Sequence, residues 1–267
     1  MPSPGKTLVL GTALGYPPKA VRPFVESLRR HYDGEVQLLV TSQHSAELLE
    51  YLRHWKITPR LFDAAAWMFT HIQLARYVRY YELLKESPVR YDLVLLTDVS
   101  DVLFQAHPFA GAPEGRLLFF MEDSRASIGG CQSNSLWVRQ IFGEQVLAQL
   151  KDSKISCAGT TMGTHEAVLH YVETLLRCAS PEKMTGLRQW RGHDQGIHNF
   201  LLHTRALPEI CTVQNGVWVH TLGQLPDADV TITEDGIRTA AGRLCPIVHQ
   251  WNYRPLAAAW VLSHWGQ

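Results

Sequence analysis

Two carboxylates that follow a strongly apolar run are the residues in this chain best placed to do chemistry. The run 92–97 leads directly into Asp98, and Asp101 follows within the same short stretch. In open α/β sheets the carboxyl ends of strands form the ligand crevice, so both acids are expected at such an edge. Carboxylate oxygens are hard ligands that suit Mg²⁺ or Mn²⁺, and these ions commonly bridge carboxylates to phosphates. The alternative is that Asp98 caps the following turn and Asp101 is merely solvated.

Three other segments carry residue types that suit a site, although each has an ordinary explanation. Asp194 and Gln195 stand at the start of an apparent helix, where Asp194 is equally suited to be an N-cap. His249 follows a short apolar run near the C-terminus, where a single histidine is more often structural. The small residues of segment 157–163 either let the backbone approach a ligand or serve tight packing.

Strand-like and helical segments alternate along the chain, and they must position these side chains. Such alternation favours a mainly parallel sheet with helices packed on it. The strand-like runs are 7–11, 35–41, 92–97 and 116–121, and the helical patterns are 20–31, 69–86, 134–150 and 165–178. The C-terminal third is expected to mix short strands with turns.

Composition excludes several classes of protein. The chain has 267 residues, of which 46% are hydrophobic and 19% charged, which suits a folded α/β protein rather than a disordered one. The formal net charge is zero, so nothing indicates nucleic-acid binding. The five cysteines are scattered without a CxxC pair, which favours buried free thiols over a cysteine-rich zinc site. No secretory signal or membrane-spanning run is visible, so a cytoplasmic location is expected, and peripheral membrane contact stays open.

Taken together and in this order, the segments resemble the GT-A glycosyltransferases, particularly the retaining group that includes the glycogenin and galactosyltransferase-like enzymes. The resemblance covers about residues 69–254 and rests on Arg76 and Tyr77 in a helix, the acidic stretch 91–109, segment 157–163, Asp194 with Gln195, and His249. It implies one α/β domain over 1–267 with a mainly parallel Rossmann-like sheet flanked by helices and a smaller mixed C-terminal region. About 1–109 would form the nucleotide-binding half and about 110–267 the acceptor and sugar half.

The resemblance also implies roles for individual residues. Asp98 and Asp101 resemble the DxD-type motif that holds Mn²⁺ or Mg²⁺ and contacts the donor ribose, and His249 resembles the histidine that completes the metal shell. The spacing departs from the usual Asp-x-Asp, so either Asp101 reaches the metal through an altered turn or Asp98 and Ser100 take the usual positions.

The remaining implied roles concern the donor. Asp194 and Gln195 resemble the pair facing the donor sugar near the reacting carbon, and Arg76 resembles a basic residue near the phosphates or sugar. Segment 11–13 (Gly11, Thr12 and Ala13) would lie near the nucleotide base. The C-terminal segment lacks the commoner His-x-x-Gly-x-x-Lys arrangement, and Arg254 is assigned the positive charge that faces the diphosphate.

The implied activity is metal-dependent transfer of a hexose-type sugar from a nucleotide sugar, most simply a UDP-sugar, to a hydroxyl of a carbohydrate or other acceptor with retention. A glycoside hydrolase also presents paired carboxylates, and a non-catalytic nucleotide- or sugar-binding module stays open as well. A Rossmann dehydrogenase is disfavoured because segment 11–15 lacks the GxGxxG spacing.

Among the aromatic residues, Trp137 is expected in the core and Trp251 and Tyr253 at the site.

Overall fold

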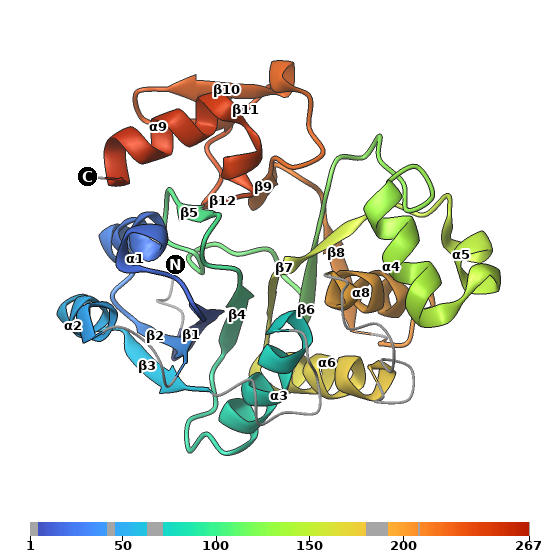
Figure 1. Ribbon diagram of the computed structural model, residues 1–267, viewed down its shortest axis with the longest axis horizontal. Helices are drawn as coiled ribbons and strands as arrows, with labels where there is room; N and C mark the ends of the chain where they lie inside the picture. The colour runs from blue at the N-terminus through green and yellow to red at the C-terminus, as the bar shows by residue number, and fades with distance from the viewer. Residues whose placement is uncertain (1–4, 42–45, 63–71, 180–191, 208, 267) are drawn as a thin grey trace.

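The computed structural model describes residues 5–41, 46–62, 72–179, 192–207 and 209–266. A central sheet with helices on both faces dominates the molecule (Figure 1). The chain is therefore a mixed α/β protein, as the alternation of strand-like and helical segments predicts. None of the helices within these described ranges is long and apolar enough to cross a membrane.

The central sheet has seven strands in the order β3-β2-β1-β4-β7-β6-β8. The strands are β1 (Thr7–Thr12), β2 (Glu35–Val40), β3 (Thr58–Leu61), β4 (Leu93–Thr97), β6 (Leu117–Met121), β7 (Ser156–Gly163) and β8 (Ile210–Val213). Strand β7 runs antiparallel to both of its neighbours, whereas the other neighbouring strands pair in parallel. The sheet is thus mainly parallel, and it takes strands from both of the expected halves of the chain.

Helices cover the two faces of this sheet because the central strands are apolar on both sides. Leu8 and Leu10 of β1 join one core cluster and Val9 joins the other, as the alternation of side chains along a strand requires. The helices are α1 (Pro18–His31), α2 (Ala46–His54), α3 (Ile72–Lys85), α4 (Gln132–Phe142), α5 (Glu144–Leu150), α6 (His165–Cys178), α8 (His193–His203) and α9 (Pro255–Trp265). Helices α3, α6 and α8 pack in the first cluster, and α1 and α2 pack in the second.

The C-terminal third forms a smaller region beside the carboxyl ends of the parallel strands. Strands β12 (Ile247–His249) and β9 (Val219–Thr221) of this region form a three-stranded sheet with β5 (Val102–Phe104) from earlier in the chain, and β10 (Val230–Thr233) and β11 (Gly236–Thr239) form a hairpin. Helix α9 follows and lies beside α1, where the Arg30 guanidinium stacks over the Trp265 ring at 4.3 Å. Because β5 comes directly after β4, this small sheet is joined to the main one at the acidic segment.

Most expected elements are present, with three differences. The helical pattern 134–150 is two helices, because Gly143 adopts a left-handed φ of 86° that an α-helix does not accept. Segment 157–163, which was assigned to no helix or strand, belongs to a buried antiparallel strand. Helix α2 and strand β3 were not expected. The first residues of the expected helix 69–86 lie outside the described ranges, and its remainder corresponds to α3.

Candidate metal centre and donor cavity

Strand pairing places Asp98, Asp101 and His249 side by side. Asp98 directly follows β4, and Asp101 directly precedes β5. His249 ends β12 and pairs in antiparallel register with Val102 of β5. The Gln250 amide donates a hydrogen bond to the Asp101 carbonyl at 2.9 Å, which extends this pairing by one residue. Residues far apart in the sequence therefore meet where the two sheets join.

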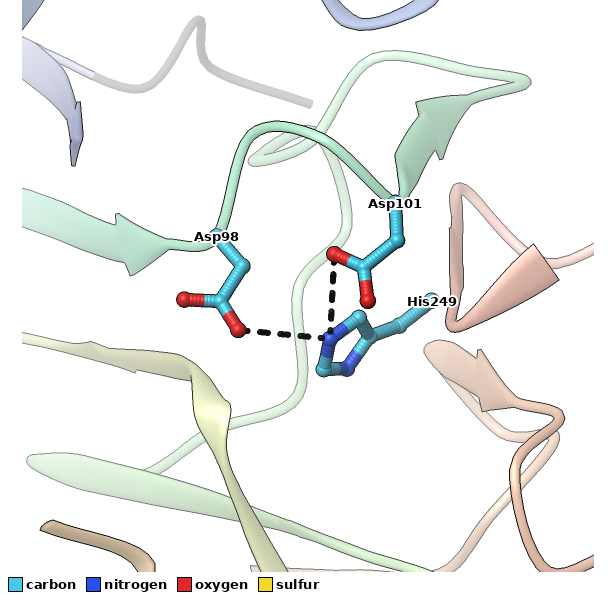
Figure 2. Close-up of side chains that lie close together, drawn as sticks. All are labelled: Asp98, Asp101 and His249. Atoms are coloured by element: carbon cyan, nitrogen blue, oxygen red, sulfur yellow. Dashed lines mark ion pairs between the residues drawn. The ribbon is translucent and has the colours of Figure 1, made fainter. Parts of the chain in front are cut away.

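The three side chains face one another with the spacing of metal ligands rather than of hydrogen-bonded partners. His249 Nε2 lies 3.7 Å from Asp98 Oδ2 and 3.8 Å from Asp101 Oδ1 (Figure 2). One candidate ligand atom from each residue can be chosen so that all of them lie within 4.8 Å of one another. A cation about 2.1 Å from each ligand separates cis ligands by about 3.0 Å and trans ligands by about 4.3 Å, so small adjustments would suffice.

The His249 ring supports a metal site because Nε2, the nitrogen that faces the two carboxylates, makes no hydrogen bond within the described residues. The residue is 1% exposed, and its Nε2 has no hydrogen-bond partner in the part of the chain that the structure describes. The other nitrogen, Nδ1, lies 3.5 Å from the sulfur of Cys157 on β7. With the Nδ1 proton directed at that sulfur, the Nε2 lone pair is available to a metal ion.

The two carboxylates give the cluster more negative than positive charge. Burial alone would lower the pKa of His249, yet its neighbours hold it well above the ordinary value. Burial also raises the pKa of the Cys157 thiol to about 11. The neighbours that raise the pKa of His249 are Cys157, Asp101 and Asp98, in that order. The pKa of Asp101 is raised by burial and by the charge of Asp98. A divalent cation would relieve this excess.

Arg76 of α3 connects the cluster to α8. One of its guanidinium nitrogens donates to Asp98 Oδ1, and the other donates to Asp194 Oδ2 at 2.8 Å. Asp98 thus directs one oxygen at Arg76 and the other at His249. Although burial opposes ionisation, the Arg76 and His249 contacts bring the pKa of Asp98 far below its ordinary value. The pKa of Asp194 is raised, because its burial outweighs its pairing with Arg76.

Gly159 of β7 permits the close approach of the cluster to the sheet. Its carbonyl accepts a hydrogen bond from the Asp98 amide at 2.8 Å. A Cβ atom at this position would lie 2.4 Å from His249 Cε1 and 2.5 Å from Asp98 Oδ2, distances that no side chain tolerates. A glycine is therefore required here if both ligands are to keep their places.

Gln195 of α8 holds the adjacent part of β7. Its Oε1 accepts a hydrogen bond from the Ala158 amide at 2.7 Å, and its Nε2 donates to the Ser156 carbonyl at 2.8 Å. Both ends of the side-chain amide are thus occupied by strand backbone. Gln195 stabilises the strand that supports the cluster, and it also contributes to the wall of the adjoining cavity.

A cavity of about 470 Å³ opens beside the two carboxylates, a volume within the usual range of ligand sites. Of the residues predicted for a site, it is lined by Thr12, Arg76, Asp98, Asp101, Asp194 and Gln195. His249 lies behind the carboxylates rather than in the wall. The remaining three lie elsewhere: Gly11 and Ala13 are not part of the lining, and Arg254 binds the carbonyls of Leu222 and Gly223 and the carboxylate of Asp227.

The aromatic residues are placed differently from expectation. Trp137 of α4 is half-buried and lines the cavity instead of filling the core. Trp251, expected at the site, is buried in the C-terminal core cluster, because the left-handed conformation of Gln250 turns the chain inward after His249. Tyr253 is 62% exposed and does line the cavity, as predicted.

Glu122 is a cavity residue that the sequence analysis missed. It directly follows β6, so it lies at the same edge of the sheet as Asp98, and it is 5% exposed. Burial raises its pKa to about 6. The signal was present in the sequence, because an acid follows the apolar run 116–121 as Asp98 follows 92–97.

Comparison with known proteins finds no family model that matches this chain, and no curated protein matches it either.

Proposed function

We propose that the protein is a metal-dependent glycosyltransferase that moves a hexose-type sugar from a UDP-sugar to an acceptor hydroxyl, with retention at the anomeric carbon. The observation that carries the proposal is the Asp98, Asp101 and His249 cluster at the wall of the 470 Å³ cavity. The mainly parallel sheet agrees with the α/β fold that the sequence resemblance implies, and the proposal includes the GT-A form of that fold.

The residues of the site suit the handling of a diphosphate sugar. A bound Mn²⁺ or Mg²⁺ supplies positive charge that stabilises a departing diphosphate. Asp98, Asp101 and His249 would hold this ion. Asp194, fixed by Arg76 at 2.8 Å in the cavity wall, would orient the sugar and stabilise positive charge at the anomeric carbon. Tyr253 and Trp137 offer apolar faces on which a sugar or a base can stack.

Calorimetric titration with UDP, with and without Mn²⁺, tests the donor site. Asp101→Asn is the informative variant, because Asp101 lies in the cluster without pairing to Arg76. The matched control is Asp92→Asn, an exposed acid just before the same strand. We expect Mn²⁺ to strengthen UDP binding in the wild type and in the control. In Asp101→Asn this increase in UDP affinity should be at least about tenfold smaller.

Turnover separates this proposal from the two alternatives. Release of UDP from UDP-glucose or UDP-galactose that stops on chelation supports the transferase. Sugar-bond cleavage that needs neither nucleotide nor metal would instead identify a glycoside hydrolase. UDP binding without any turnover would identify a binding module.

A further inference from the structure

A second cavity meets the donor cavity at Glu122. It has a volume of about 650 Å³ and lies between the ends of β6 and β8 and the C-terminal hairpin region. Glu122 is the residue that lines both cavities. A molecule in each cavity would therefore have Glu122 as a neighbour.

Glu122 is buried, and the neighbours that favour its ionised form are the charge of His249 and a hydrogen bond from the Cys157 thiol. Its side chain makes no ion pair with any lysine, arginine or histidine in the described ranges. The nearest amide donor is Gln195 Nε2, which lies 3.5 Å from Glu122 Oε1, the limit of a hydrogen bond. Because Gln195 reaches Oε1 only at this limit, the carboxylate that borders the two cavities can accept a further hydrogen bond from a ligand.

The walls of the second cavity carry several polar side chains that suit a ligand rich in hydroxyl groups. Arg125 is held in the wall by ion pairs with Asp123 and Asp229, so these groups form a fixed set of donors and acceptors. His220 lines the cavity at 2% exposure, and its Nδ1 lacks a hydrogen-bond partner in the described part of the chain. Burial lowers the pKa of His220 to about 4, so its ring is neutral at pH 7 and can both donate and accept.

We propose that the second cavity binds a carbohydrate acceptor and that Glu122 binds its attacking hydroxyl. This inference rests on the proposed function. In the transfer step, the acceptor oxygen forms a bond to the anomeric carbon, and the bond from that carbon to the diphosphate breaks with its electron pair on the diphosphate. The hydroxyl proton passes to the Glu122 carboxylate. Glu122 is thus the catalytic group on the acceptor side of the site.

Two variants test the two parts of this proposal. Glu122→Gln keeps the shape and hydrogen-bonding capacity of the side chain but cannot take the proton, so kcat should fall about 100-fold while UDP affinity in Mn²⁺ stays within about threefold. Glu114→Gln, an exposed glutamate before the same strand, is the control. Ala240→Trp fills the second cavity from an exposed wall position. It should raise the acceptor KM at least about tenfold and leave hydrolysis of the donor by water unchanged.

The measurements use UDP-glucose and UDP-galactose as donors and glucose, maltose, lactose and cellobiose as acceptors. Unchanged kcat in Glu122→Gln would overturn the catalytic assignment, and unchanged acceptor KM in Ala240→Trp would overturn the acceptor cavity. A wild type that hydrolyses donor but glycosylates none of these sugars would overturn the carbohydrate acceptor. Failure of UDP to bind, or binding with no donor turnover at all, would instead overturn the transferase itself, and the acceptor assignment with it.

Discussion

Gly159→Ala should abolish metal-dependent nucleotide binding without removing any ligand. The added Cβ would lie 2.4 Å from His249 Cε1 and 2.7 Å from His249 Nε2. Ordinary contacts between carbon atoms are about 3.5 to 4.0 Å, so the imidazole must move by about 1 Å. Metal–ligand distances hold to within about 0.2 Å, and a shift of this size breaks the His249 bond.

The expected loss of Mn²⁺ affinity is about 100-fold, which corresponds to about 2.8 kcal/mol. The protein should stay folded, because the clashing atoms belong to side chains and overpacking costs about 1–3 kcal/mol. Calorimetry with Mn²⁺ and with UDP measures the first effect, and urea unfolding measures the second. Gly130→Ala is the control, because its Cβ would meet only the Ser127 hydroxyl at 3.1 Å. A folded Gly159→Ala protein with wild-type Mn²⁺ affinity would refute the assignment of His249 as a ligand.

The remaining predictions concern stability and pH. Arg76→Met should lower the free energy of unfolding by about 3–5 kcal/mol because it leaves Asp194 unpaired and removes one of the two cationic partners of Asp98. Arg79→Met, at a half-buried position that pairs with Glu82, should cost less than about 1 kcal/mol in the same urea titration, and equal losses would contradict this reasoning. Gln195→Leu should lower the melting temperature by leaving the buried Ala158 amide unsatisfied, whereas the Ser156 carbonyl keeps its hydrogen bond from Asn199, and an unchanged value would show that water replaces the Gln195 side chain. Burial lowers the pKa of His198 to about 3, whereas an unfolded histidine titrates near 6.5. The unfolded state therefore binds the extra proton, so stability from this residue is complete above pH 6.5 and is lost as the pH falls. Between pH 7 and pH 5 the wild type should lose about 2 kcal/mol more than His198→Gln, and parallel losses in urea unfolding would contradict this.

Local sequence patterns were sufficient for most of the elements, because strand and helix periodicity depends on which faces are buried. The run 92–97 ends at the sheet edge as predicted, and Asp194 stands at the start of a helix. The alternation of apolar and polar residues could not identify a strand that is buried on both faces. Segment 157–163 is buried throughout, so it has no alternation to mark it as a strand. Gly143 likewise interrupts a region that has a helical pattern on either side of it.

The sequence alone identified the chemistry that is available: acids after a strand, an acid and amide opening a helix, and a late histidine. It could not show that Asp101 comes within 3.8 Å of His249, because that follows from the register of β12 on β5. It also could not show that Arg254 binds backbone carbonyls beyond the cavity wall, or that Glu122 lies between two cavities. Each of these depends on contacts between segments distant along the chain, and only the packing of the two sheets against each other determines them.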